Sequence, residues 1–213
     1  MPESSSLTLS AHQVSVWRGE RCLCRDLNFA LHGGEALHLQ GINGAGKTSL
    51  IRVLTGLGRC DAGEVRWCGA PLRRLGPEYR AAIAYVGHSN GVNLGLSPRE
   101  NLRAAGALAQ IPSGAAVQAA LDEVHLGSQA DSACATLSMG QRRRTALARL
   151  LLTRGPLWFL DEPLASLDVS GVAWLSGVLR AHLAGGGLAV YATHQALDLA
   201  PHRVQALALK AAT

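Results

Sequence analysis

Hydrophobic residues in the first third of this 213-residue chain fall in short runs that end at polar or glycine-rich turns. Runs of this length and composition predict β-strands at residues 7–16, 27–31 and 36–40. A glycine-rich loop follows the third run, and a helix is expected from there to about Leu57, ended by Gly58. Two more strands are predicted, over "EVRWCG" (64–69) and "AIAYVGH" (82–88). The beginning of the chain is therefore β-rich, with one early helix.

The stretch of residues 97–153 has a different pattern, because alanine and leucine recur there at helical spacing. Its first helix is predicted at "SPRE", where Ser97 can cap, Pro98 suits the first turn and Glu100 can return the capping bond. Further helices are predicted over residues 112–126 and 138–152. We interpret this stretch as a helical insertion of about 55 residues.

Buried-type runs resume after the insertion, at residues 156–161, 188–194 and 204–209, with a helix predicted over residues 169–183. Apolar runs alternating with helices indicate an α/β fold whose mostly parallel sheet is covered on both faces. We expect a single domain over residues 1–213, with the helical insertion inside the α/β core.

The composition supports a globular domain, with 48% hydrophobic and 16% charged residues and a net charge of +5. This basic excess suits a phosphate-bearing ligand or an anionic membrane surface, and it is too weak to indicate nucleic-acid binding. No apolar run reaches the roughly 18 residues of a membrane span, and the start lacks a signal-peptide pattern. The cysteines are odd in number and have no zinc spacing, which favours a reducing compartment: Cys22, Cys24, Cys60, Cys68 and Cys134.

The segment "GINGAGKTS" fits the phosphate-loop pattern G-x-x-x-x-G-K-[ST] at every fixed position. Backbone amides in such a loop, followed by a helix N-terminus, concentrate positive charge where phosphates bind. Lys47 can neutralise the β- and γ-phosphates, and the Thr48 hydroxyl can ligate Mg²⁺. The predicted nucleotide-binding residues of this loop are Gly41, Ile42, Asn43, Gly44, Ala45, Gly46, Lys47, Thr48 and Ser49.

Acidic residues and a histidine follow two later strands, in "LWFLDEP" and "LAVYATH". Ligands bind at the carboxyl ends of parallel strands, so these side chains are expected in the same crevice as the phosphate loop. Asp161 would hold Mg²⁺ through water, and Glu162 would polarise the attacking water. His194 would hydrogen-bond the γ-phosphate or that water.

A second glycine-containing turn, "TLSMGQRRR" (136–144), also has the features of an anion site. Ser138 can cap a helix, Gly140 lets the backbone approach a ligand, and the helix N-terminus offers free amides. This turn lies at the far end of the insertion, so we expect it to serve the nucleotide of another subunit. The predicted contacts are Ser138, Met139, Gly140 and Gln141, in a head-to-tail arrangement with ATP at the interface.

The order and spacing of these motifs resemble ABC-type ATPases over nearly the whole chain, from about residue 7 to residue 209. The resemblance rests on the phosphate loop, "LSMGQ", "LDEP", "ASLD" (165–168) and "TH". It implies a P-loop NTPase fold with an antiparallel β portion on the N-terminal side. It also implies a dimer that closes on two ATP molecules with Mg²⁺, in which Glu162 drives hydrolysis and Asp168 couples the two sites.

Two positions depart from the family pattern. Many members have a glutamine that reaches Mg²⁺ where this chain has Ser89. Because the serine side chain is shorter, the contact to the ion is made either by Ser89 or, in its place, by a water or Asn90. Members often have an aromatic residue on adenine immediately before the glycine that corresponds to Gly19. Here that residue is Arg18, with Trp17 beside it, and either side chain can stack on the base.

Local segments such as "YVGHSNGVNLGLSPRENL" and "ATHQAL" look like the ATP-binding subunit of cytochrome c maturation, or haem, exporters. That resemblance implies a peripheral subunit on the cytoplasmic face of a bacterial inner membrane, paired with a second nucleotide-binding subunit and docked to transmembrane subunits. Residues 91–97 and the start of the insertion would form the docking surface. The alternatives are an ATPase of another ABC transporter, a soluble ABC ATPase of DNA repair or translation, and a nucleotide kinase.

Overall fold

A five-stranded parallel sheet forms the centre of the chain, which the computed structural model describes over residues 7–108 and 114–209. The strand order is β6-β7-β8-β3-β9. Three of these strands are buried along all or nearly all of their length, which explains their continuous apolar runs. The strands are β3 (Ala36–Gln40), β6 (Ile83–Val86), β7 (Leu157–Asp161), β8 (Leu188–Ala192) and β9 (Val204–Ala208).

A second, antiparallel sheet lies on the N-terminal side, with strand order β2-β1-β4-β5. Its strands are β1 (Thr8–Arg18), β2 (Arg21–His32), β4 (Ala62–Trp67) and β5 (Ala70–Pro71). The strand predicted at residues 27–31 begins six residues earlier, at Arg21. Polar side chains lie on the exposed face in the first half of β2, so the hydrophobic pattern did not indicate a strand there.

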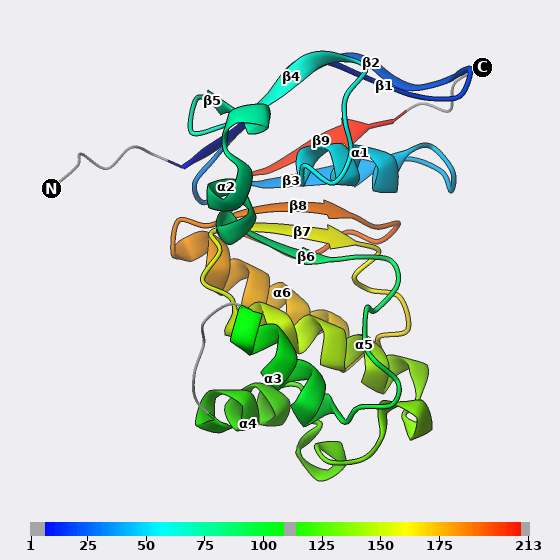
Figure 1. The fold of residues 1–213 in the computed structure, drawn as a ribbon, viewed down its shortest axis with the longest axis vertical. Helices are drawn as coiled ribbons and strands as arrows, with labels where there is room; N and C mark the ends of the chain where they lie inside the picture. The colour runs from blue at the N-terminus through cyan, green and yellow to red at the C-terminus, as the bar shows by residue number, and fades with distance from the viewer. Residues whose placement is uncertain (1–6, 109–113, 210–213) are drawn as a thin grey trace, which may run out of the picture.

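Helix α1 (Lys47–Leu54) lies between the two sheets, and α2 (Gly76–Ala82) follows the short η1 (Leu72–Arg74) beside them (Figure 1). The prediction that Gly58 ends the first helix was wrong. The helix stops at Leu54, because Gly56 adopts the left-handed conformation with φ 74° and its amide donates to the Val53 carbonyl oxygen.

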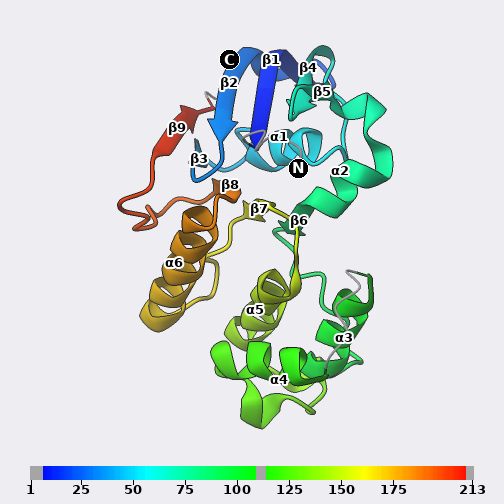
Figure 2. The ribbon, with the colours of Figure 1, turned by 90° about the vertical axis from the view of Figure 1, so that its left-hand side faces the viewer.

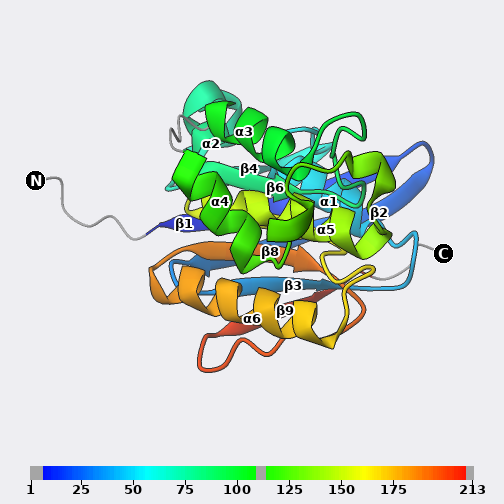
Figure 3. The same cartoon turned by 90° about the horizontal axis from the view of Figure 1, so that it is seen from below.

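The other face of the parallel sheet is covered by α5 (Met139–Ala148) and α6 (Val169–Ala184), which lie in front of the strands in Figure 3. The helical region, which includes α5 and lies between β6 and β7 in the sequence, is seen below the sheet in Figure 2. Its remaining elements are α3 (Pro98–Leu108), α4 (Gly114–Glu123), η2 (Gly127–Gln129), η3 (Cys134–Thr136) and η4 (Arg149–Leu152).

The predicted cap of the first helix in this region is confirmed. The Glu100 amide donates to Ser97 Oγ at 3.2 Å, and the Ser97 amide donates to Glu100 Oε2 at 2.8 Å. Residues 112–113, where the next helix was expected to begin, lie outside the described residues. In the described part of the chain, no helix is long and apolar enough to span a bilayer.

Parallel pairing of β3 with β8 and of β8 with β7 brings the carboxyl ends of these strands to one edge. Figure 1 shows the loops that follow them on the right-hand side of the sheet. The glycine-rich loop, the two acidic residues and the histidine therefore meet, as the sequence predicts for a parallel sheet.

Candidate nucleotide-binding site

The loop of residues 41–46 connects β3 directly to α1, whose first residue is Lys47. Gly44 and Gly46 both have left-handed backbones, with φ 78° and 101°. A Cβ atom on Gly46 would also lie 2.9 Å from Leu23 Cβ, so the position excludes a side chain on both counts. The glycines thus let the chain turn sharply and place the N-terminus of α1 at the sheet edge.

Lys47 is buried, with 7% of its surface exposed, and within the described residues the shortest contacts of its amine are to neutral carbonyl groups. Nζ donates to the carbonyl oxygens of Gly41 at 2.7 Å and Ile42 at 3.3 Å. The carboxylate oxygen Oε1 of Glu162 is 3.7 Å away. A buried cation with this loose set of contacts is suited to bind an anion that enters the loop.

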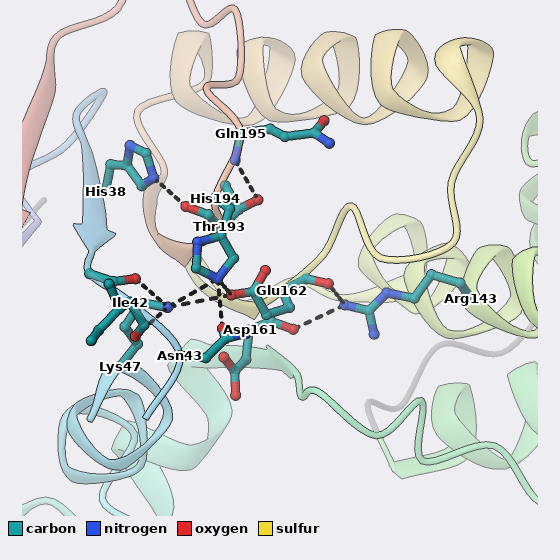
Figure 4. A network of polar contacts seen from close by, with 11 residues as sticks. His38, Ile42, Asn43, Lys47, Arg143, Asp161, Glu162, Thr193, His194 and Gln195 are labelled. Atoms are coloured by element: carbon teal, nitrogen blue, oxygen red, sulfur yellow. Dashed lines mark hydrogen bonds and ion pairs between the residues drawn. The ribbon is translucent and has the colours of Figure 1, made fainter. Parts of the chain in front are cut away.

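Glu162 and His194 complete the group around Lys47 (Figure 4). His194 Nε2 lies 3.5 Å from Glu162 Oε1 and also 3.5 Å from Lys47 Nζ. Nε2 makes a shorter hydrogen bond of 2.8 Å to Asn43 Oδ1. Side chains from three separate segments, the start of α1 and the loops after β7 and β8, therefore converge within hydrogen-bonding or ion-pair distance.

The segment that carries His194 is supported from behind by buried polar side chains. His38 Nε2 donates to the Thr193 carbonyl oxygen at 2.9 Å, and the His38 ring stacks on Tyr191 with ring centroids 4.6 Å apart. Burial raises the pKa of the Tyr191 hydroxyl to about 12. These contacts fix the backbone immediately before His194.

Asp161 has the features expected of a residue beside a bound cation. The residue is 1% exposed, and neither carboxylate oxygen has a hydrogen-bond partner within the described chain. No group of three or more histidine, cysteine, aspartate or glutamate side chains that could hold a metal occurs in the described residues. One carboxylate, a threonine hydroxyl and phosphate oxygens are a donor set that Mg²⁺ accepts, so Asp161 and Thr48 fit this ion.

A hollow of about 390 Å³ lies over the phosphate loop. It contains most of the predicted nucleotide-binding and metal residues together with several that the sequence reasoning missed. Its lining consists of Arg18, Arg21, Leu23, Asn43, Gly44, Gly46, Lys47, Thr48, Ser49, His88, Asp161 and Glu162.

The missed residues are Arg21, Leu23 and His88. Arg21 pairs with Arg18 across the turn at Gly19. If "WRGER" had been interpreted as a hairpin turn, the start of β2 would have been predicted to lie beside Arg18 at the site. Trp17 lies outside the lining, with the Arg25 guanidinium 5.5 Å from its ring centre. The choice between Trp17 and Arg18 for the base remains a prediction, and Arg18 is the one of the two that lines the hollow.

The loop after β6 places its side chains differently from the sequence expectation. His88 lines the hollow, whereas Ser89 is exposed and absent from the lining. Asn90, the suggested substitute, has its Oδ1 occupied by Arg143 Nη1 at 3.1 Å. A metal contact by Ser89 stays a prediction.

The turn at residues 136–141 lies at the N-terminus of α5, on the opposite face of the sheet from α1 (Figure 2). Ser138 caps α5: the Gln141 amide donates to Ser138 Oγ at 3.2 Å, and the Ser138 amide donates to Gln141 Oε1 at 2.9 Å. Met139 is 71% exposed. A Cβ on Gly140 would be 2.8 Å from the Ser166 carbonyl oxygen, so this glycine also permits packing on the loop before Asp168.

Asp168 caps α6 by accepting from the Gly171 amide at 2.9 Å, and it accepts from Arg144 Nη2 at 2.6 Å. The Gly171 bond, with help from Ser170 and Arg144, lowers the pKa of the Asp168 carboxyl. Within the described residues, neither Asp168 nor any of the residues 138–141 lines the hollow. Their predicted role at a second copy's nucleotide therefore stays a prediction.

Comparison with known proteins places this geometry in a family. The model of the ABC transporter family matches residues 24–165. The chain belongs to the ABC transporter family. It is accordingly an ATPase, and the nucleotide of its phosphate loop is ATP.

Curated relatives resemble the chain over nearly its whole length. The "Cytochrome c biogenesis ATP-binding export protein CcmA" of Dechloromonas aromatica is 47% identical over 94% of this chain and 99% of that protein. The protein of the same name from Methylococcus capsulatus is 45% identical over 92% of this chain and 95% of its own.

Solved structures share the fold at lower identity. The ADP- and Pi-bound dimer of the ATP-binding cassette MJ0796 superposes with a TM-score of 0.83 at 21% identity, over 95% of this chain and 94% of that one. A putative ABC transporter ATP-binding protein of Pyrococcus furiosus gives 0.82 at 22% identity, over 97% and 100%. The predicted P-loop fold with its parallel and antiparallel sheets is confirmed.

Proposed function

We propose that this chain is the ATP-hydrolysing subunit of an export complex for cytochrome c biogenesis, and that it drives haem delivery. Relatives with this printed role support the assignment across nearly the full chain. The whole of residues 1–213 acts as one nucleotide-binding domain. It works on the cytoplasmic face of the bacterial inner membrane, docked to transmembrane subunits through residues 91–97 and the start of α3.

The observation that carries the proposed chemistry is the convergence of Lys47, Glu162 and His194 at the end of the parallel sheet. When ATP enters, Lys47 exchanges its two carbonyl contacts for the β- and γ-phosphate oxygens. Glu162 then loses the nearby cation and accepts a proton from the attacking water. His194 donates through Nε2 to the γ-phosphate instead of to Asn43.

The residues proposed to hold Mg²⁺ are Thr48, Asp161 and Ser89. The bound ion would neutralise charge that develops on the β- and γ-phosphate oxygens. The buried carboxylate of Asp161, which has no hydrogen-bond partner among the residues that the structure describes, supports this assignment most directly.

A second copy of the chain is proposed to complete each site. Apolar side chains stand exposed in or directly beside the motifs: Ile42 in the phosphate loop at 65%, Met139 at the start of α5 at 71% and Val169 at the start of α6 at 89%. Burial of these side chains against another copy would stabilise a dimer. Ser138, Met139, Gly140, Gln141 and Asp168 of that copy would then contact the nucleotide held by Lys47.

Replacement of the proposed base tests the chemistry. Glu162→Gln should lower kcat of the purified chain by about 10²–10⁴-fold, the usual contribution of a general base, with ATP affinity changed less than about threefold. Glu78→Gln, on the exposed surface of α2, is the control and should keep wild-type kcat. Unchanged hydrolysis in Glu162→Gln would refute the assignment.

Mixing two inactive variants tests the composite site. Lys47→Met and Ser138→Arg should each abolish turnover alone. An equal mixture should recover up to about a quarter of wild-type activity, because half of the dimers are mixed and each holds one intact site. No recovery in the mixture, or an active Ser138→Arg chain, would contradict a shared site.

Production of c-type cytochromes tests the biological role. In a bacterium that lacks its own export ATPase of this kind, the wild-type chain should restore haem-stained c-type cytochromes, and Glu162→Gln should not. Active ATPase without restored cytochromes would assign the chain to a different ABC transporter.

A further inference from the structure

Arg143 is buried at the junction of three segments, with 2% of its surface exposed. A guanidinium has five N–H donors, and each one is used here. Nε donates to the Pro163 carbonyl oxygen at 3.2 Å, Nη1 to Gly87 O at 2.9 Å and Asn90 Oδ1 at 3.1 Å, and Nη2 to Asp161 O at 3.0 Å and Glu162 O at 2.7 Å. Figure 4 shows Arg143 beside Asp161 and Glu162. Through its further bonds to Gly87 and Asn90, this one side chain of α5 joins the end of β7 and the loop after it to the loop after β6.

Burying a charged group at this position has a cost. Burial lowers the pKa of the Arg143 guanidinium to about 10, and the carboxylates of Asp161 and Glu162 act in the opposite direction. The side chain therefore stays charged at neutral pH, and its five hydrogen bonds have to offset the desolvation cost of the charge. The same hydrogen bonds also hold the neighbouring backbone of Asp161 and Glu162 in place.

That effect is clearest at Glu162. Its backbone is left-handed, with φ 48°, a conformation that costs a non-glycine residue about 1–2 kcal/mol. Three hydrogen bonds hold it there: the Glu162 amide donates to Ala192 O at 2.8 Å, and the Glu162 carbonyl oxygen accepts from the Ala165 amide at 3.2 Å and from Arg143 Nη2 at 2.7 Å, the shortest of the three. The direction of the Glu162 carboxylate toward Lys47 depends on this backbone conformation.

The two arginines beside Arg143 in the sequence bind elsewhere. Arg142 donates to the carbonyl oxygens of Cys134 and Ala135, within the helical region. Arg144 donates to Val124 O and to Asp168 Oδ1. Among the three arginines of α5, Arg143 is thus the one bound to the backbone of Glu162. Arg180 of α6 pairs with the exposed Asp198 and offers a control outside both predicted anion-binding turns.

We propose that Arg143 is a positioning residue for ATP hydrolysis. It holds the left-handed backbone of Glu162 and links it to the loop of residues 87–90, so that the carboxylate keeps its orientation toward the nucleotide. This proposal rests on the proposed role of Glu162 as the base. Arg143 itself touches the carbonyl oxygens behind the site and not the reacting atoms.

The first test separates positioning from nucleotide binding. In the purified full-length chain, Arg143→Gln should lower kcat by about 10–100-fold, the range caused by a misplacement of about 1 Å. The Kd for ATP should change less than about threefold, because none of the hydrogen bonds of Arg143 in the described chain goes to the phosphate loop. Arg143→Lys, which keeps the charge and some donors, should recover part of kcat, and the control Arg180→Gln should keep kcat within about twofold.

A double-mutant cycle then tests whether Arg143 acts through Glu162. In the Glu162→Gln background, Arg143→Gln should leave the residual hydrolysis rate unchanged within about twofold. An equal further loss in that background, or wild-type kcat in Arg143→Gln alone, would overturn the proposal. If Arg143→Gln does not fold, Arg143→Lys is measured in the same cycle and must show a smaller loss with the same dependence on Glu162.

The failure of the base assignment would be visible separately, as full kcat in Glu162→Gln alone. In that case a loss of kcat in Arg143→Gln could not be assigned to the Glu162 carboxylate, and the proposal would fall with the assignment. Full kcat in Arg143→Gln beside a strong loss in Glu162→Gln would refute only the positioning role.

Discussion

The two sides of strand β7 satisfy their polar groups in different ways. On the side of the phosphate loop, Lys47 holds two carbonyl oxygens and lies 3.7 Å from Glu162, and Asp161 has no hydrogen-bond partner for either carboxylate oxygen in the described chain. On the side of α5, all five donors of Arg143 are bonded, and Ser138 is satisfied by its own capping box.

This difference separates groups that are available to a ligand from groups that hold the frame. Unbonded or loosely bonded buried charges cost free energy, and a bound triphosphate with its cation can offset that cost. Fully bonded groups would lose more than they gain by binding a ligand. At the end of β7, the residues proposed to react thus have hydrogen-bonding groups left for a ligand, whereas the proposed positioning residue has all of its groups bonded.

The largest expected effect is on stability without nucleotide. Arg143→Met should lower the free energy of unfolding by about 3 kcal/mol, because several buried carbonyl oxygens lose their donor. Lys47→Met should change it by less than about 1 kcal/mol, since its contacts are few and methionine fills a similar volume. Urea unfolding of the two variants measures this, and equal losses would remove the proposed distinction.

ATP affinity should show the reverse order. Lys47→Met should raise Kd by about 10–150-fold, which corresponds to the 1.5–3 kcal/mol of hydrogen bonds made by a charged group. Arg143→Met should leave Kd within about threefold. Calorimetric titration of ATP into each purified variant gives the comparison, and a weak effect of Lys47→Met would contradict its role as the phosphate ligand.

Ser138 can be used to separate capping from ligand binding. Ser138→Ala should destabilise α5 by about 1 kcal/mol, because the cap is lost. Ser138→Asp should keep the cap and the stability, but its negative charge should repel a nucleotide on a second copy and lower kcat. Thermal unfolding and ATPase assays on both variants decide this, and full activity in Ser138→Asp would exclude a nucleotide contact.

The smallest effect concerns pH. The pKa of the Asp168 carboxyl is lowered from its ordinary value of 3.8 by the Gly171 amide, Ser170 and Arg144. A lowered pKa means that the stabilising contribution is complete above the unfolded value and is lost as pH falls through the folded value. Unfolding temperatures of wild type and Asp168→Asn should therefore differ near pH 6, and the difference should shrink as the pH falls below the ordinary value of 3.8. A constant difference would show that the charge plays no part.

Much of the fold could be predicted because its signals are local. The continuous apolar runs before Gly41 and Asp161 indicated parallel strands, and the pair Ser97 and Glu100 marked a helix start, as the structure confirms. The start of β2 and the end of α1 were misplaced. The start of β2, where polar residues lie on an exposed face, is determined by strand packing. The end of α1 is determined by the backbone geometry at Gly56. Neither feature can be read from the local hydrophobic pattern.

The sequence by itself determined the phosphate loop, the strand-end acids and the family, since these depend on fixed spacings along the chain. Only the tertiary structure brought Arg21, Leu23 and His88 to the hollow, because their positions arise from strand pairing and loop paths between distant segments. The same is true of Arg143. In sequence it is one of three adjacent arginines, and the packing of α5 alone decides which of them reaches the backbone of Glu162.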